Sequence, residues 1–294
     1  MGFRKIVISN PAQLCIRNAN LSIQQDGVIT NIPAEDISIL ILEHSCISIT
    51  NSVLDTLAQN GTLIFSCNKS HLPVSIFTPF QSHSRQRRRI GEQIALTEPF
   101  KKRIWQRIVI QKVYNQAVCL EINGKKKDAQ QLYSLSRNVL SGDSTNIESE
   151  AAMIYFRSLF SINFSRRVDS PINAALNYGY AIVRACIARN LVIYGFIPSL
   201  GIYHRNEYNN FNLADDFIEP IRPFIDKWVS ANVSEETDFC KGMRYELVRL
   251  LDEKVNYNGK MYELSNVLEF MIKSYVTAIS ENDYDKLELP KLIV

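Results

Sequence analysis

The spacing of the apolar residues changes near residue 80, and this change constrains the fold more than any other feature of the chain. Before it, short runs such as KIVISN, LSIQQ and VSIFTPF alternate apolar and polar side chains, with Asn, Gly, Pro and Asp between them. Such alternation is typical of β-strands with one buried face. One segment, SVLDTLAQNG, breaks the pattern and predicts a helix that ends at Asn60-Gly61. The first 80 residues therefore predict a small β-rich domain.

Beyond the basic segment PFQSHSRQRRRIG, apolar residues recur with the period of helices. The predicted helices span 90–122, 125–140, 147–161, 170–196, 213–231, 241–254 and 265–281. Asn258-Gly259 lies between alternating apolar residues and predicts a two-residue hairpin. We therefore expect an α+β fold, with a small N-terminal β-strand domain (1–80), a linker (81–89) and a larger all-α catalytic domain (90–294).

The composition is that of an ordinary globular protein and gives little sign of a membrane or secreted setting. The chain has 294 residues, 46% hydrophobic and 21% charged, which is enough for two cores. Its six cysteines show no CxxC spacing, so neither a zinc site nor a disulfide framework is expected. The start MGFRKIVISN lacks the pattern of a secretory signal, and Arg184 and Arg189 interrupt the most apolar later run. We expect a cytoplasmic protein.

Positive charge is concentrated in one part of the sequence. Residues 85–127 contain twelve Lys or Arg and three Glu, a balance of +9, although the whole chain carries only +3. Such a stretch suits binding to phosphate groups, or it forms the solvated faces of helices. The sequence leaves both interpretations open.

The segment YHRNEYNNFNLADDFIEPIRPFID places His204, one of only four histidines, shortly before Asp215, Asp216 and Glu219. Asp216 and Glu219 are three residues apart, so they share one face of a helix. Acids at the start of a helix also complement its dipole without any further role. A histidine with carboxylates, by contrast, is a mixed N/O ligand set that suits Mg²⁺ or Mn²⁺.

A second acidic candidate lies upstream, in DSTNIESEAAMIYF. Glu148 and Tyr155 are two helical turns apart on one face, with the small Ala152 between them. Glu150 is rotated by roughly 200° from Glu148 and points elsewhere. Spacing alone does not force Glu148 and His204 to meet in space.

The order of these motifs resembles the CRISPR-associated integrase family, and in particular its type II branch. The resemblance rests on MGFRKIVISN, NIESEAAMIYF, FSRRVDSPINAALNYGYAIVRACIARNLVIYGFIPSLGIYH, NEYNNFNLADDFIEPIRPFID and the YNGK hairpin, and it covers nearly the full chain. It implies a β-strand domain before a helical catalytic domain. It also implies a Mg²⁺ or Mn²⁺ site formed by Glu148, His204 and Glu219, with Asp216 as a ligand through water or as a neighbour that orients one.

The resemblance further implies a metal-dependent DNA endonuclease and integrase of antiviral defence. Such an enzyme joins the 3′-hydroxyl ends of foreign DNA fragments to the CRISPR repeat by transesterification. The implied partners are DNA, a second copy of the chain held by the N-terminal domain, a small adaptation partner protein and the type II effector nuclease. The residues that we expect to contact DNA phosphates are Arg85, Arg87, Arg88, Arg89, Lys101, Lys102, Arg103, Arg166 and Arg167. A non-catalytic DNA-binding assembly subunit and a DNA-trimming nuclease remain alternatives.

Overall fold

The chain forms two compact units. The computed structural model describes residues 2–69, 71–77 and 85–293. The first, here called the N-terminal unit, comprises Met1–Gln81 and Cys240–Arg249, and the second, the helical unit, comprises Ser82–Phe239 and Leu250–Val294.

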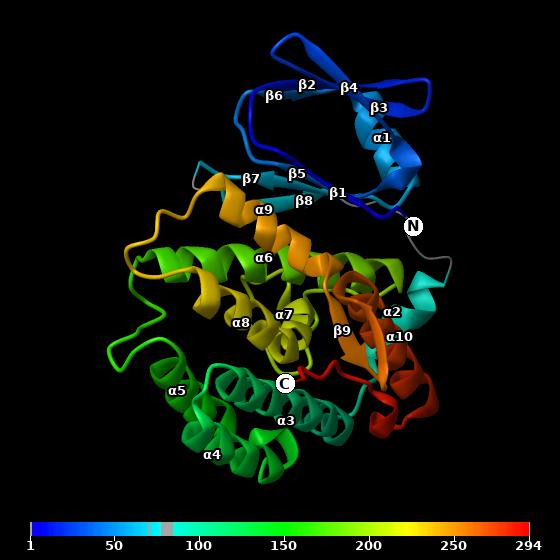
Figure 1. Ribbon diagram of the computed structural model, residues 1–294. Helices are drawn as coiled ribbons and strands as arrows, with labels where there is room; N and C mark the ends of the chain where they lie inside the picture. Colours follow the sequence, from blue (N-terminus) through cyan, green and yellow to red (C-terminus); the bar gives the residue numbers. More distant parts are fainter. Residues whose placement is uncertain (1, 70, 78–84, 294) are drawn as a thin grey trace. The chain divides into compact units, whose positions relative to one another are not determined.

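The N-terminal unit contains two four-stranded sheets and one helix (Figure 1). One sheet has the order β1-β5-β7-β8 and the other β4-β3-β2-β6. The elements are β1 (Arg4–Ile8), β2 (Ala12–Arg17), β3 (Asn20–Gln25), β4 (Val28–Pro33), β5 (Ile37–Leu42), β6 (Ile47–Ile49), α1 (Asn51–Gln59), β7 (Leu63–Cys67) and β8 (Pro73–Phe77). The pairings β1–β5, β5–β7 and β2–β6 are parallel, and the other strand pairings are antiparallel. Helix α1 ends at Asn60 with Gly61 at φ +70°, as the sequence predicts.

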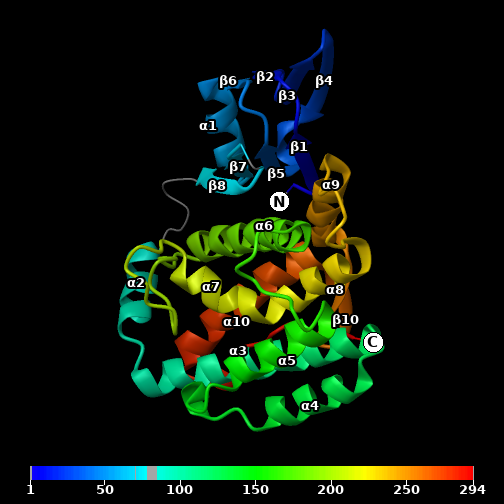
Figure 2. The ribbon, with the colours of Figure 1, turned by 90° about the vertical axis from the view of Figure 1, so that its left-hand side faces the viewer.

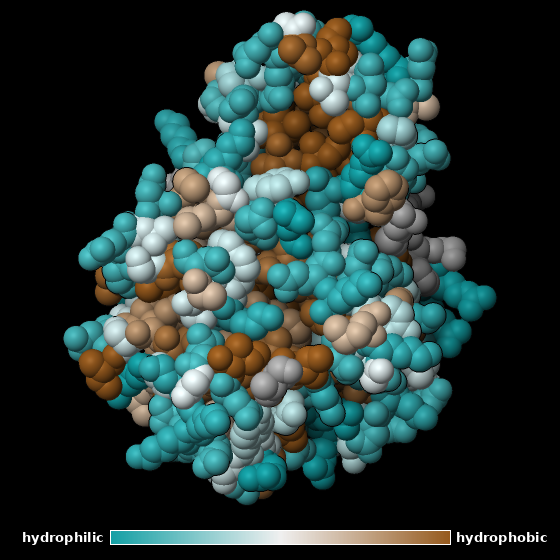
Figure 3. Space-filling view, viewed as in Figure 1, coloured by the Kyte–Doolittle hydropathy of each residue, from teal (hydrophilic) through white to brown (hydrophobic). Residues whose placement is uncertain are grey.

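Inward-facing aliphatic side chains from both sheets and α1 form the core of this unit. Leu14, Leu21, Ile37, Leu40 and Leu57 are completely or almost completely buried there. In the space-filling view, further apolar side chains come to the surface of the N-terminal unit between the two sheets (Figure 3). Exposed apolar surface of this kind often marks a contact with another chain.

Helix α9 (Lys241–Arg249) belongs to the N-terminal unit although it lies late in the sequence. Arg244 on α9 pairs with Glu43 through two contacts, Nε to Oε1 at 3.2 Å and Nη2 to Oε2 at 3.4 Å. The predicted domains, residues 1–80 and 90–294, placed α9 in the helical domain, whereas the structure places it in the N-terminal unit. The predicted linker, residues 81–89, overlaps α2 (Gln86–Ile94), and residues 81–84 lie outside the described residues.

The helical unit is built around the 25-residue helix α3 (Glu98–Ile122). Helices α4 (Lys126–Arg137) and α5 (Ile147–Leu159) pack against α3 and against each other, and they lie beside it in both ribbon views (Figures 1 and 2). The remaining elements are α6 (Pro171–Ile193), α7 (Asn212–Ile218), α8 (Arg222–Asn232), α10 (Leu264–Glu281) and the hairpin of β9 (Lys254–Tyr257) and β10 (Lys260–Glu263). The predicted fold class, a β-strand region followed by a mainly helical region, is confirmed.

Two segments that the sequence predicts as single helices are interrupted. The predicted helix 90–122 breaks between α2 and α3. The Thr97 side chain accepts a hydrogen bond from Phe100 N, and a new helix begins at Glu98 with Pro99 in its first turn. The predicted helix 213–231 breaks at a 3₁₀ turn over Glu219–Ile221. Pro220 and Pro223 lack the N–H groups that a continuous α-helix needs at these positions.

The hairpin predicted at Asn258-Gly259 is present, with φ of +51° and +76° at the two turn residues. These angles suit a type I′ turn. None of the helices in the described part of the chain combines the length and the apolar character that a membrane-spanning segment requires.

Candidate functional site

Asp143 fixes the start of α5 and thereby the position of Glu148. Its carboxylate accepts hydrogen bonds from the backbone N–H groups of Ile147 (2.9 Å) and Glu148 (3.0 Å). Asp143 lies three residues before the N-cap residue Asn146, and its carboxylate satisfies N–H groups of the first helical turn. The Glu148 side chain is partly buried, whereas Glu150 is exposed, so the two glutamates point in different directions as predicted.

A tight loop after α6 presents His204. At Gly201 a Cβ atom would lie 2.2 Å from the carbonyl oxygen of His204, so only glycine fits this position. The fully buried carboxylate of Asp216 accepts hydrogen bonds from Ile202 N (2.5 Å) and His204 N (3.0 Å). The same carboxylate lies 2.8 Å from Nδ1 of His204. Asp216 therefore shapes the loop and fixes the imidazole, which leaves Nε2 as the nitrogen for other contacts.

Aromatic rings form one wall beside His204. Trp105, buried on α3, stacks on Tyr203 with ring centroids 4.2 Å apart and an angle of 2° between the planes. Its ring also meets His204 edge to face at 5.7 Å. These contacts restrict the imidazole from a side that Asp216 does not cover. The hydrogen bond with Asp216 raises the pKa of His204, against the lowering effect of burial.

Two cations hold Glu219 on the 3₁₀ turn. Lys112 Nζ lies 2.5 Å from its Oε2, and Arg222 Nε donates to its Oε1 at 3.0 Å. Burial by itself would raise the pKa of Glu219, but Arg222 and Lys112 outweigh burial and lower this pKa to about 2. The ammonium of Lys112 also donates to Glu148 Oε1 at 2.6 Å. Burial likewise opposes the charge of Lys112, but Glu219 and Glu148 raise its pKa overall.

Lys112 joins Glu148 to Glu219, Asp216 holds His204, and the charges of His204 and Glu219 act on each other, so the four predicted residues lie in one part of the helical unit. Within the described residues, no three His, Cys, Asp or Glu side chains are arranged as a ready metal-binding group. The donor chemistry nevertheless fits Mg²⁺ or Mn²⁺, because it offers two carboxylates and an imidazole whose Nδ1 is already bound. Oε2 of Glu219 is buried and lies 2.5 Å from the ammonium of Lys112, so this position already holds a positive charge. Lys112 is the cation that now lies there.

Lys112 was not predicted from the sequence, although the sequence contains one signal for it. The helix 98–122 is apolar on the face that carries Ile104 and Ile108, and Lys112 follows on that same face. A charged side chain on the buried face of a helix requires a partner of opposite charge. That signal predicts a buried ion pair but does not identify the acids that complete it.

A further buried acid lies near this site on α8. Asp226 accepts hydrogen bonds from the hydroxyls of Tyr155 (3.0 Å) and Tyr180. Burial raises the pKa of Asp226 to about 6, although the tyrosines and nearby arginines act in the opposite direction. Tyr155, which the sequence places on the face of Glu148, therefore serves the packing of α5 against α8.

The raised pKa of Asp226 predicts that the stability of the helical unit depends on pH. The folded state binds this proton more tightly than the unfolded state, so the contribution is present below the ordinary value of 3.8 and is lost as the pH rises through about 6. The loss amounts to about 3 kcal/mol for a shift of about two units. Urea unfolding followed by tryptophan fluorescence reports this unit, because both tryptophans, Trp105 and Trp228, lie in it.

The matched variant for this prediction is Asp226→Asn, which cannot ionise. The difference in unfolding free energy between wild type and Asp226→Asn is expected to change by about 3 kcal/mol between pH 4 and pH 7. Glu235→Gln, at an exposed acid, serves as the control for the loss of one charge. A difference that stays constant over this range would contradict the prediction.

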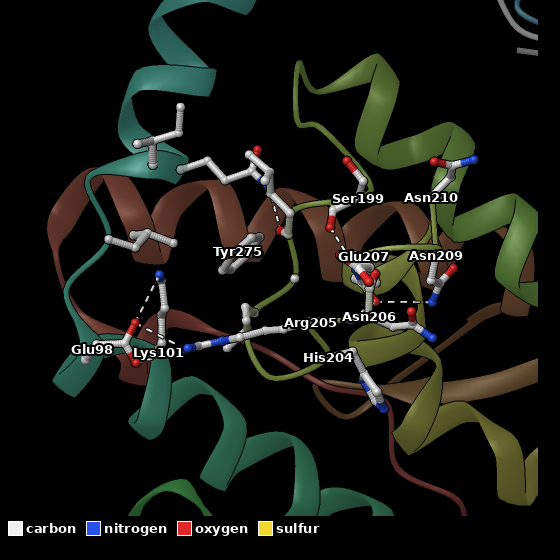
Figure 4. A pocket seen from close by; sticks show the side chains of 17 residues that line it. Glu98, Lys101, Ser199, His204, Arg205, Asn206, Glu207, Asn209, Asn210 and Tyr275 are labelled. Carbon is white, nitrogen blue, oxygen red and sulfur yellow. Dashed lines mark hydrogen bonds and ion pairs between the residues drawn. The ribbon is translucent and has the colours of Figure 1, made fainter.

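A pocket of about 610 Å³ opens beside His204 (Figure 4). Its polar lining includes Ser199 and Asn206 from the loop and Glu98 and Lys101 from α3. Arg205 spans toward Glu98, with Nη2 2.9 Å from Oε2. The pocket is large enough for part of a polar ligand, and His204 forms part of its wall.

The predicted DNA-contact residues differ in how they are held. Arg87, Lys102 and Arg167 are exposed. Five others are engaged within the protein: Arg88 and Arg89 with Glu92, Lys101 with Glu98, Arg103 with Gln106, and Arg166 with Asn173 and Asn177. Arg85 is exposed at the start of α2. Their contact with DNA stays a prediction.

Comparison with known proteins identifies the family. The sequence model described as CRISPR associated protein Cas1 matches residues 6–252. The chain is also 35% identical to the CRISPR-associated endonuclease Cas1 of Neisseria meningitidis serogroup C, over 100% of this chain and 97% of the relative. This chain belongs to the Cas1 family. The CRISPR-associated integrase family and type II branch predicted from the motifs are thereby confirmed.

Other comparisons agree with the Cas1 assignment. A Cas1 endonuclease of Saccharolobus solfataricus is 29% identical over 76% of this chain and 73% of its own length. Among solved structures, a casposase bound to integration product has a TM-score of 0.76 at 18% identity, over 97% of this chain and 94% of the other. A Cas1 protein from Thermotoga maritima has a TM-score of 0.74 at 16% identity, over 94% and 97%. At such identities the structures show the shared Cas1 fold.

A third solved structure is longer than this chain. A chain of a Cas6-RT-Cas1–Cas2 complex has a TM-score of 0.76 at 19% identity over 98% of this chain. The present chain spans 36% of the length of that protein. The match therefore concerns its Cas1-like fold.

Proposed function

We propose that this Cas1 protein is a metal-dependent DNA integrase of CRISPR adaptation. It joins the 3′-hydroxyl ends of foreign DNA fragments to the CRISPR repeat by transesterification. The observation that carries the proposal is that Glu148 and Glu219 share the ammonium of Lys112, while the charges of Glu219 and His204 act on each other. The relatives named as endonucleases and the casposase bound to integration product support a DNA-processing activity of this class.

Glu148, Glu219 and Nε2 of His204 would hold Mg²⁺ or Mn²⁺. A divalent ion bound there supplies charge stabilisation for a DNA phosphate and favours the ionised form of an attacking hydroxyl. Asp216 keeps the His204 ring oriented, and Trp105 limits its rotation. The pocket beside His204 would receive the end of a DNA strand and position it for in-line attack on the phosphate.

DNA would be held largely through its backbone. Exposed Arg87, Lys102 and Arg167 are the best placed of the predicted basic residues to reach phosphates. Basic residues that already pair within the protein, such as Arg88 and Arg89 with Glu92, would contribute to the charge of the DNA-binding surface and not contact phosphates directly. Binding of this type weakens steeply as salt is raised.

The assembly proposed for this chain contains further proteins. A Cas2 protein is the small adaptation partner, by analogy with the complex whose name includes Cas1 and Cas2. A second copy of the chain would pair through the N-terminal unit, where apolar side chains reach the surface (Figure 3). The resemblance to the type II branch adds the effector nuclease as a partner during acquisition.

An integration assay tests the proposed function. Purified protein and its Cas2 partner are combined with a labelled DNA fragment and a supercoiled plasmid that carries the repeat, with Mn²⁺ or with a chelator. We expect joined product only with the metal, and none from Glu148→Ala or His204→Ala, while both variants still bind DNA. Unchanged joining by both variants would favour a non-catalytic role for these residues. Shortened fragments without joined product would favour the trimming nuclease that the name endonuclease also allows.

A further inference from the structure

Lys112 lies inside the candidate site and not at its edge. The residue is 7% exposed, on a stretch of α3 between Ile108 and Val113, which are fully buried. Its ammonium lies 2.6 Å from Glu148 Oε1 and 2.5 Å from Glu219 Oε2. Removing an ammonium from water is costly unless opposite charges compensate it closely. Lys112 therefore depends on the same two carboxylates that are proposed to bind a metal ion.

The charges of the two proposed carboxylate ligands are balanced without an added ion. Glu148 and Glu219 contribute two negative charges, and Lys112 and Arg222 contribute two positive charges. Each oxygen of Glu219 already faces one of these cations. A divalent cation at the same carboxylates would therefore meet the positive charge of Lys112 at close range, where repulsion is strong in a buried environment.

The two native cations differ in how firmly they are held. The guanidinium of Arg222 lies over the ring of Tyr180, 4.5 Å from its centroid, and is fixed on both sides by this ring and by Glu219. Lys112 has a flexible four-carbon side chain that ends in a single point charge. Lys112, which has no ring stacked on its charged group among the described contacts, is thus the less firmly held of the two cations.

We propose that Lys112 is a positioning residue that serves as the internal counter-ion of the metal site. It holds Glu148 and Glu219 close together while no metal is bound, and it withdraws from both carboxylates when a divalent cation binds. Cation binding therefore competes with Lys112, and the affinity of the site is set lower than its carboxylates alone would give. This inference rests on the proposed metal-dependent function.

Metal binding to the full-length protein tests the inference directly. Isothermal titration with Mn²⁺ is compared between wild type, Lys112→Met and Lys273→Met, where Lys273 is an exposed lysine of α10. Lys112→Met is expected to bind Mn²⁺ about tenfold more tightly than wild type, equal to about 1.4 kcal/mol. Without metal, Lys112→Met should melt at a lower temperature than wild type, because no ammonium separates Glu148 from Glu219. Mn²⁺ should raise the melting temperature of Lys112→Met by more than that of wild type. Lys273→Met should match wild type in both measurements.

Unchanged or weaker Mn²⁺ binding by Lys112→Met would overturn the inference. Suppose that Lys112→Met binds Mn²⁺ no more tightly than wild type, while wild type binds Mn²⁺ and Glu148→Ala does not. The proposed metal site is then supported, and only the role of Lys112 is disproved. If wild type binds no Mn²⁺, the proposed function and the inference both fail. Lys112→Gln replaces Lys112→Met if the latter does not fold, because its amide can still donate hydrogen bonds to the carboxylates without a charge.

A measurement on the wild-type protein avoids substitutions altogether. Brief acetylation of amines followed by peptide mass spectrometry reports the accessibility of each lysine. Lys112 should react little without metal, since it is buried and paired, and several-fold more with saturating Mn²⁺, whereas Lys273 should react equally in both states. Equal labelling of Lys112 with and without Mn²⁺ would contradict its withdrawal.

Discussion

Replacing Glu219 with alanine is expected to abolish DNA joining and to destabilise the helical unit. The side chain is 4% exposed and is the only carboxylate that contacts both Lys112 and Arg222 among the ion pairs of the described residues. Its loss leaves the buried ammonium of Lys112 with Glu148 alone and removes the carboxylate partner of Arg222, which should cost about 3–5 kcal/mol of unfolding free energy. The substitution also removes a proposed metal ligand. A metal ion stabilises a transition state by several kcal/mol, so the rate of DNA joining should fall by a factor on the order of 10³ or more.

Two further variants separate the loss of chemistry from the loss of stability. Glu219→Gln keeps the size of the side chain and an acceptor for Arg222, so it should be less destabilised than Glu219→Ala while still failing to join DNA. Glu150→Ala, at the exposed glutamate of α5, should retain both stability and joining. Joining is measured in the plasmid assay, and unfolding is followed by tryptophan fluorescence in urea. Near-normal joining by Glu219→Gln would show that the charge of Glu219 is not required.

Local sequence signals predicted the elements that local chemistry determines. Asn258-Gly259 specified the β9–β10 turn, because few other residues adopt positive φ at both positions of a type I′ turn. Asn60-Gly61 specified the end of α1 in the same way. The break at Glu219–Ile221 was not predicted, because the apolar period continues through Pro220 although the hydrogen bonds of an α-helix do not.

The candidate site was predictable in its residues but not in its connections. The motifs around Glu148, His204 and Glu219 identified the acids and the histidine through their resemblance to a known family. Lys112 lies on a different helix and meets both acids only through tertiary packing. Likewise, the sequence suggested Arg166 as a DNA contact, whereas folding engages its guanidinium with Asn173 and Asn177. Long-range pairing of this kind leaves no periodic pattern in the chain.

The return of α9 to the N-terminal unit has the same origin, and it leads to a second prediction of large effect. Arg244 and Glu43 are 9% and 3% exposed and form a two-point ion pair within that unit. Arg244→Met should destabilise the N-terminal unit by about 3–5 kcal/mol, because Glu43 would remain buried without this partner. Hydrogen exchange with mass spectrometry measures this effect, since peptides of β1, β5 and α9 should exchange faster.

The double variant Arg244→Met/Glu43→Gln distinguishes an unpaired charge from lost packing. Removing both charges should recover most of the protection, because replacing a buried ion pair by uncharged groups costs much less than breaking it. Arg249→Met, at an exposed arginine of the same helix that pairs with Glu246, should change exchange very little. If the double variant exchanges as fast as Arg244→Met, the side-chain packing of Arg244, and not its charge, holds α9 on the N-terminal unit.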